Sequence, residues 1–160
     1  MDTTTTLLSI LLALLPISEL RGAIPFAVMR GRDLLSAALI CTAVNVLVPL
    51  LAFAFLSTFH HLFYRLAWYK GFFDRIVEST RAKVHAKVEK YGYWGLLVFV
   101  AIPLPITGAW TGALGAWILG MGKRKACVAI AGGVIIAGII VTALVGILGA
   151  GAKTIFFKAI

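Results

Sequence analysis

The sequence predicts an all-α integral membrane protein with two inverted repeats, each a re-entrant helical hairpin followed by a transmembrane helix, joined by an amphipathic surface helix. Three observations support this fold class. Of the 160 residues, 61% are hydrophobic and 13% are charged, and the mean hydropathy is +1.02. Soluble domains hold about 45–50% apolar and about 25% charged residues. Long stretches carry no charge, and a broken apolar run followed by an unbroken one occurs twice. These features exclude a soluble globular fold and a disordered chain.

The first apolar run, residues 3–29, is interrupted in its middle. Pro16 ends the first apolar half, a polar elbow covers residues 17–22, and a second apolar half follows that contains Pro25. Proline breaks helices, because it lacks the N–H that a helix interior needs. We therefore expect two half-helices that enter the membrane, turn near its middle and leave on the same side.

The second and fourth apolar runs, residues 34–59 and 126–152, are uninterrupted by charge. About 20 apolar residues suffice to cross the hydrocarbon of a bilayer, so each run predicts a transmembrane helix. In the fourth run a ridge of small residues recurs every four positions, which favours close helix packing. The ridge consists of Gly138, Thr142, Gly146 and Ala150.

The third run, residues 91–122, has no charge and would be about 48 Å long as one helix. That length is too great for one span and too short for two. Because Pro103, Pro105 and Gly108 lie in its middle, we expect a second re-entrant hairpin. The first hairpin returns to its own side and the span after it crosses, so the second hairpin must enter from the opposite side.

The whole chain then forms a single membrane domain. Its first repeat covers about residues 3–59 and its second about 92–152, and an amphipathic helix at about 62–91 lies along the membrane surface between them. Ten basic residues lie in residues 65–90 and 123–125. The positive-inside rule places them in the cytoplasm, with the protein in the cytoplasmic membrane and both termini outside.

The basic balance and the cysteines exclude other kinds of partner. The chain has 15 Lys and Arg against 6 Asp and Glu, net +9, but the bases lie between apolar runs. This favours membrane orientation over a nucleic-acid partner. Cys41 and Cys127 lie inside apolar runs and form no C-x-x-C pair, so we expect no disulfide framework, metal site or cofactor. No P-loop, G-x-G-x-x-G or nucleophile–base pair suggests an enzyme.

Glu19 and Arg21 are the only charges inside the apolar regions. Ionisable groups at membrane depth are costly and commonly mark a substrate pathway or a proton relay. Glu19 is therefore a candidate proton carrier and Arg21 a candidate anion-binding group. The alternative is a structural ion pair that pins the elbow.

The second elbow, residues 102–112, has no charge but offers the hydroxyls of Thr107 and Thr111 and the indole N–H of Trp110. Each elbow starts a new half-helix, and the free N–H groups at such a terminus favour an anion. The threonines could instead cap the helix. Asn45, in the middle of the second run, needs a partner, either the unwound backbone of an elbow or a neighbouring helix. The candidate substrate- and proton-binding residues are Glu19, Arg21, Gly22, Pro25, Asn45, Pro103, Pro105, Thr107, Gly108, Trp110, Thr111 and Gly112.

Residues 19–25, 45–49 and 101–114 resemble the hallmark motifs of the small multidrug export family, which is itself similar to the DedA/VTT group of membrane proteins. The resemblance covers nearly the whole chain, although Ile106 stands where the family more often has glycine, which implies a stiffer elbow. It implies paired re-entrant hairpins that face each other. It also implies transport of an amphiphilic, lipid-like anion, because the DedA/VTT group includes polyprenyl-phosphate transporters and phospholipid scramblases.

Three functions remain open at this point. The first is a transporter or flippase for a lipid-like anion, either uncoupled or coupled to protons through Glu19. The second is a proton-coupled exporter of hydrophobic drug cations, which Arg21 beside Glu19 disfavours. The third is a non-transporting membrane assembly factor. Since so small a bundle has little protein to shield a polar elbow, we also expect a homodimer among membrane lipids.

Overall fold

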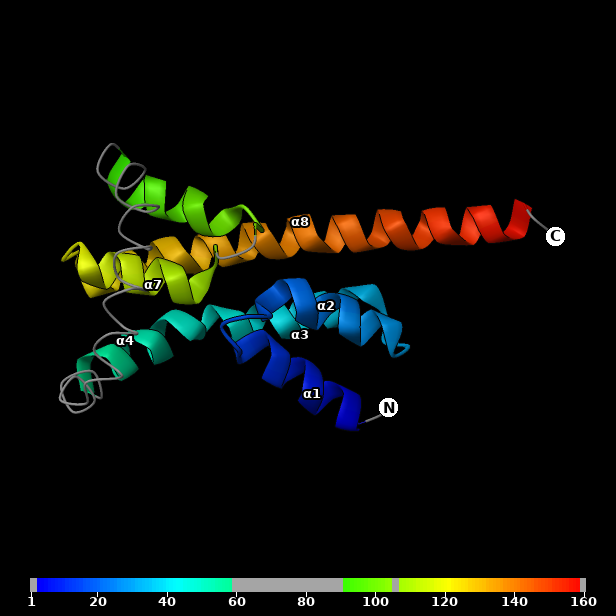
Figure 1. Ribbon diagram of the computed structural model, residues 1–160, viewed down its shortest axis with the longest axis horizontal. Coiled ribbons are helices and arrows are strands. Elements are labelled where there is room, and N and C mark those ends of the chain that lie inside the picture. The colour runs from blue at the N-terminus through cyan, green and yellow to red at the C-terminus, as the bar shows by residue number, and fades with distance from the viewer. Residues whose placement is uncertain (1–2, 59–90, 105–106, 159–160) are drawn as a thin grey trace.

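The computed structural model describes residues 3–58, 91–104 and 107–158, with side chains as far as residue 149. All regular structure in these residues is helical (Figure 1). The predicted amphipathic helix at 62–91 lies outside them except for its last residue, and Pro105 and Ile106 lie outside them as well. The helices are α1 (Thr3–Leu14), α2 (Glu19–Met29), α3 (Leu34–Val46), α4 (Val48–Thr58), the helix Tyr91–Ala101, α7 (Ala109–Ile118) and α8 (Lys123–Lys158).

Helices α1 and α2 form the first predicted helical pair, and they pack against each other. The turn between them covers residues 15–18, so the predicted elbow is placed too late. Glu19, Arg21 and Gly22 belong to the first turn of α2 rather than to the elbow. The reason is that helical bonding resumes at once after Pro16: the Gly22 N–H donates to the Ser18 carbonyl at 3.1 Å.

The predicted span at 34–59 is present as Leu34–Thr58, but it is broken into α3 and α4 at Leu47. Pro49 lies two residues after the break and has no N–H to offer the preceding turn, which accounts for it. At the start of α3, Asp33 is the N-cap, and its carboxylate accepts a bond from the Ser36 N–H at 2.9 Å.

The helix Tyr91–Ala101 and α7 form the second predicted pair. The first of them ends at Ala101, two residues before Pro103. Helix α7 begins at Ala109 after the N-cap Gly108, so Trp110, Thr111 and Gly112 lie in its first turn and not in the elbow as predicted. In both elbows the return helix starts earlier than the composition suggested.

Helix α8 extends beyond the predicted bounds 126–152 at both ends. Its apolar part, Lys123–Gly149, and Leu34–Thr58 are long and apolar enough to cross a membrane. The small-residue ridge packs against α3: a Cβ added at Gly138 would lie 2.5 Å from the Thr42 hydroxyl oxygen, and one at Gly146 would lie 3.1 Å from Leu34. This confirms the prediction of close helix packing for the described part of the ridge.

The turns of the two pairs meet in the middle of the molecule, while their open ends point in opposite directions (Figure 1). Helix α2 packs on α3 and α8, and α7 packs on α4 and α8. The two return helices are thus held between the same two long apolar segments. The order of a helical pair and then a long helix agrees with the sequence, whereas the inverted-repeat and re-entrant assignments remain predictions.

Candidate functional site

The carboxylate of Glu19 binds the N-terminus of α7, which belongs to the other helical pair. The Ala109 N–H donates to Glu19 Oε2 at 3.2 Å, and the Trp110 N–H donates to Oε1 at 3.3 Å. The N-cap Gly108 has no side chain with which to do this. Since Glu19 is only 6% exposed, these charge-assisted bonds and the helix dipole stabilise a carboxylate taken out of water. The anion position predicted at this terminus is occupied by the protein's own carboxylate.

The close approach of Glu19 to α7 requires glycine at position 108. A Cβ there would lie 2.0 Å from Glu19 Oε2, well inside contact distance. Gly108 also has a φ of 155°, which L-residues rarely adopt. Glu19 itself has a φ of 46°, a left-handed conformation that is costly for a residue with a side chain. Backbone strain therefore concentrates at this contact.

Arg21 binds the second elbow through backbone carbonyl groups. Its guanidinium donates to the Leu104 carbonyl and to the Thr107 carbonyl, the latter at 2.6 Å. In the described part of the chain, Arg21 and Glu19 form no ion pair with each other. The alternative of a structural ion pair is therefore wrong, because each of the two side chains has a different partner. The physical reason is that the broken helix leaves N–H and C=O groups without helical partners, and the two charged side chains satisfy them.

Side chains from α7 and α3 bind backbone carbonyl groups at the end of α1. The Trp110 indole N–H donates to the Leu14 carbonyl at 2.8 Å. The Asn45 amide donates to the Ala13 carbonyl at 2.6 Å. Of the two partners considered for Asn45, the neighbouring helix is the one that it binds, at a carbonyl in the last turn of α1 just before the elbow. Each helical pair supplies partners for backbone groups that the other leaves unpaired.

The two threonines do not cap α7. The Thr107 hydroxyl lies 2.6 Å from the Ile102 carbonyl and accepts a bond from the Leu104 N–H at 3.1 Å, which closes its own loop. The Thr111 hydroxyl lies 3.3 Å from the Gly108 carbonyl. The alternative that these hydroxyls cap the helix is wrong, because the cap comes from Glu19 on α2.

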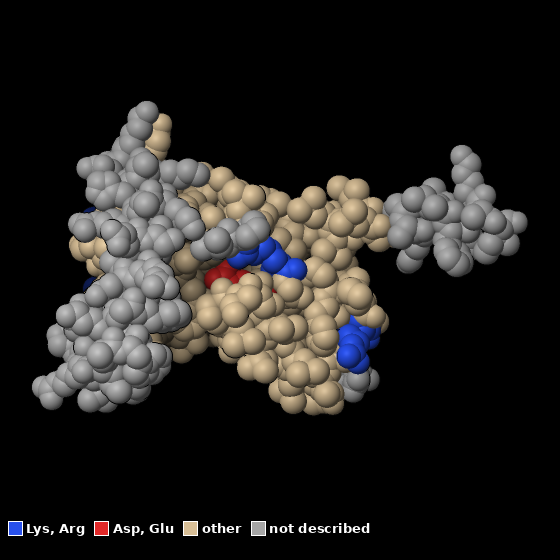
Figure 2. Space-filling model, viewed as in Figure 1, with Lys and Arg blue, Asp and Glu red and all other residues tan. Residues whose placement is uncertain are grey.

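Two cavities adjoin this junction, and Arg21 lines both. A small cavity of about 10 Å³ is also lined by Glu19, Asn45, Pro103, Thr107 and Gly108. An open cavity of about 590 Å³ is lined by Pro16, Ile17, Ser18, Arg21, Gly22, Thr107 and Thr111. Figure 2 shows acidic and basic atoms side by side in the middle of a largely uncharged face.

Two predicted site residues lie elsewhere. Neither cavity is lined by Pro25 or Gly112. Gly112 has a packing role, because a Cβ there would lie 2.6 Å from Val100. Ser18 and the carbonyls of Ala13, Leu14 and Leu104 belong to the junction but were not among the predicted site residues. Backbone carbonyls carry no sequence signal, and Ser18 lay within the predicted elbow without being singled out.

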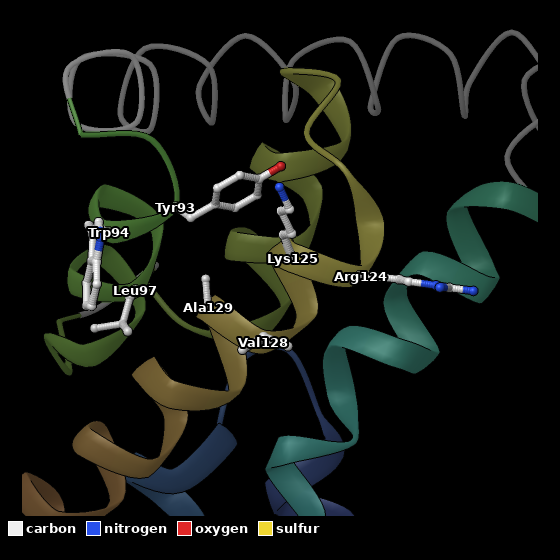
Figure 3. A pocket seen from close by; sticks show the side chains of 7 residues that line it. All are labelled: Tyr93, Trp94, Leu97, Arg124, Lys125, Val128 and Ala129. Atoms are coloured by element: carbon white, nitrogen blue, oxygen red, sulfur yellow. The ribbon is translucent and has the colours of Figure 1, made fainter.

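A separate, largely apolar cavity of about 450 Å³ lies between the helix Tyr91–Ala101 and the start of α8. Figure 3 shows Tyr93 and Lys125 pointing toward each other above Ala129, while Arg124 points away toward α4. The Tyr93 hydroxyl accepts a bond from the Gly122 N–H at 3.2 Å. This cavity shares no lining residue with the two at the junction, and none of its described lining residues is a predicted site residue. The candidate site is therefore the junction.

The long apolar helices and the polar junction between two broken helical pairs define a helical integral membrane protein. Its family follows from comparison of the sequence with known families. The chain belongs to the family described as "Putative small multi-drug export protein", whose model matches residues 19–140. The match begins at Glu19 and includes Arg21, Asn45 and the residues of the second elbow as far as Thr111, whereas residues 13–18 of the junction precede it. No curated protein and no solved structure matches the chain.

Proposed function

We propose that the protein is a transporter, not an enzyme, that moves an amphiphilic, lipid-like anion such as a polyprenyl phosphate or a phospholipid. Membership of an export family supports transport. One observation carries the choice of an anion: Arg21 is the only charged side chain among the described residues that line the open cavity, and the hydroxyl residues Ser18, Thr107 and Thr111 line it too. A guanidinium flanked by hydroxyls suits a phosphate head group.

In this proposal the Glu19 carboxylate competes with the substrate anion for one binding position. As a carboxylate it holds the N-terminus of α7, a position that also suits a substrate anion. When Glu19 takes up a proton, its bonds to the two N–H groups weaken, because hydrogen bonds to a charged acceptor are about twice as strong as neutral ones. The substrate head group then binds the α7 terminus beside Arg21. Proton uptake and anion binding are coupled in this way.

The proposal places the junction near the middle of the cytoplasmic membrane. The two helical pairs are re-entrant hairpins of inverted repeats that enter from opposite sides, with Lys123, Arg124 and Lys125 facing the cytoplasm. The meeting of the two turns in Figure 1 supports this arrangement. Broken backbone at membrane depth needs protein partners, which Glu19 and Arg21 supply. A homodimer would shield the open cavity from lipid.

The second candidate is proton-coupled export of drug cations, which the family description favours. A cation would have to reach Glu19, which is 6% exposed and bonded to α7. It would do so beside Arg21, which repels it. The third candidate, a non-transporting assembly factor, would use the same contacts only to hold the helices together.

Transbilayer movement in liposomes tests the proposal. Purified protein is reconstituted, and a fluorescent phospholipid, a fluorescent polyprenyl phosphate and a hydrophobic cation are followed with and without a pH gradient. We expect faster movement of an anionic lipid that is lost in Glu19→Gln and in Arg21→Ala. Arg124→Ala is the matched control, because it also removes one arginine but lies outside the junction.

Each other outcome of this assay contradicts the proposal. Cation movement that survives Arg21→Ala favours the drug exporter. If all three probes move no faster than in empty liposomes although the protein is folded, transport of these classes is excluded and the assembly factor remains.

A further inference from the structure

Asn45 is fully buried, yet only half of its amide is hydrogen-bonded. The amide nitrogen donates to the Ala13 carbonyl at 2.6 Å, which fixes which amide atom is the oxygen. The other atom, Oδ1, has no hydrogen-bond partner among the described residues. An unpaired buried acceptor is rare and calls for a donor.

Asn45 and Glu19 line the same small cavity. Its volume of about 10 Å³ is near the lower limit for one water molecule. The other described residues around it are mostly apolar, and Arg21 is the only other charged one. The apolar lining from α8 consists of Val134, Ala137 and Val141.

Among the polar residues of this cavity, Glu19 is the one whose capacity to donate changes with pH. The Arg21 guanidinium holds the carbonyls of Leu104 and Thr107, and none of its N–H groups is bonded to Asn45 Oδ1. The Thr107 hydroxyl closes its own loop. A carboxylate at Glu19 has no hydrogen to give, but a protonated carboxyl has one O–H.

We infer that Asn45 Oδ1 accepts the O–H of protonated Glu19, directly or through one water in this cavity, so that the two residues form a proton-binding site between α2 and α3. The inference deepens the proposed function, on which it rests for the role of Glu19 as the proton carrier. A proton fits better than a metal cation, because Arg21 lines the same cavity and repels a cation. The only covalent bond that forms is the O–H of Glu19.

This site gives Glu19 two alternative sets of partners. As a carboxylate it accepts bonds from the Ala109 and Trp110 N–H groups of α7. Once protonated it donates to Asn45 on α3. Among the described residues that line the cavity with Glu19, Arg21 on α2 itself is the other charged group, and Asn45 and Thr107 are the polar ones from other elements. Proton uptake therefore shifts Glu19 from α7 to α3 and frees the α7 terminus.

Infrared difference spectroscopy tests the inference without altering Asn45, because it is the only asparagine in the chain. A heavy carbon isotope placed only at Cγ of asparagine marks its side-chain carbonyl alone. In labelled protein in liposomes, we expect acidification to shift this carbonyl band to lower frequency as Oδ1 gains a hydrogen bond. The shift should be absent in Glu19→Gln, which cannot titrate. It should persist in Trp110→Phe, which removes another bond to the end of α1 and leaves Oδ1 untouched.

Three results would overturn the inference: a band that does not respond to pH, the same response in Glu19→Gln, or a shift produced by sodium ions at constant pH. Lipid movement measured in the same liposomes separates the inference from the proposed function. Proton-coupled movement with an unresponsive band refutes the role of Asn45 alone. A responsive band without any movement refutes transport alone.

Discussion

Glu19 and Arg21 are the residues on which the junction depends, and both could be singled out from the sequence. Charges inside apolar runs are costly, so their presence alone indicates a role. Their partners could not be predicted. The structural alternative paired the two with each other, whereas each binds backbone groups of the second helical pair. Such groups are present at every residue, so no sequence pattern marks the ones that lack helical partners.

The contact between Glu19 and α7 predicts a severe effect of Gly108→Ala. The added Cβ would lie 2.0 Å from Glu19 Oε2 and displace the carboxylate, so α7 would lose its cap. We expect the free energy of unfolding to fall by about 2–4 kcal/mol, from the lost charge-assisted bonds and the backbone strain. Thermal unfolding in detergent, with the liposome assay alongside, measures both stability and transport.

Gly120→Ala is the matched control for this substitution. Gly120 has a φ of +64°, but nothing lies within 4 Å of an added Cβ. It should cost only the backbone term, about 1 kcal/mol, and leave transport intact. Equal destabilisation by the two substitutions would contradict a specific role for the Glu19 contact.

At the scale of single helices, two of the prolines marked breaks correctly, but the break before Pro49 was not predicted and Pro25 lies inside α2. The helix starts were predicted poorly. Pro16 and Pro103 follow the ends of α1 and of the helix Tyr91–Ala101, as expected. The return helices begin at Glu19 and Ala109, inside the stretches assigned to the elbows. A helix starts where its first turn finds partners, and here those partners are distant in sequence.

The N-cap of α3 predicts a measurable acid sensitivity. Hydrogen bonds from the Ser36 hydroxyl and N–H hold the pKa of the Asp33 carboxyl below its usual value. The folded state therefore gains stability from Asp33 above about pH 4, and loses it as the pH falls through the lowered pKa. Asparagine caps equally well but does not titrate.

We accordingly expect the melting temperature of Asp33→Asn to fall less on acidification than that of the wild type, with similar values at neutral pH. The difference between the two pH profiles isolates Asp33 from the other acidic residues. Parallel profiles would show that the cap contributes nothing to acid sensitivity.

The packing of α8 predicts that Gly133 cannot be enlarged. A Cβ at Gly133 would lie 2.7 Å from the Leu97 carbonyl oxygen and 2.8 Å from the Val100 Cβ. Because backbone cannot move aside cheaply, Gly133→Ala should separate α8 from the helix Tyr91–Ala101 and cost about 1–3 kcal/mol. Gly149→Ala, with nothing within 4 Å, should be neutral in the same thermal unfolding assay. Comparable losses in both variants would contradict this packing.

For the whole molecule, composition and charge spacing predicted the class of fold and the order of its helices. The close packing of the bundle follows from its small residues: alanines such as Ala23, Ala27, Ala113 and Ala116 are fully buried. The mutual bonding of the two turns could not be predicted, because it depends on how segments some 90 residues apart meet in space. The junction arises only in the assembled molecule.

The central claim is that the open cavity at this junction is the substrate path. Blocking it tests the claim most directly. Thr111→Cys, in a background with Cys41→Ser and Cys127→Ser, places a thiol in the cavity wall, and Val128→Cys places one in the separate cavity between the helix Tyr91–Ala101 and α8. We expect a bulky thiol reagent to stop lipid movement only at position 111, with the anionic lipid slowing its reaction there. Undiminished movement after complete labelling of Thr111→Cys would contradict the account.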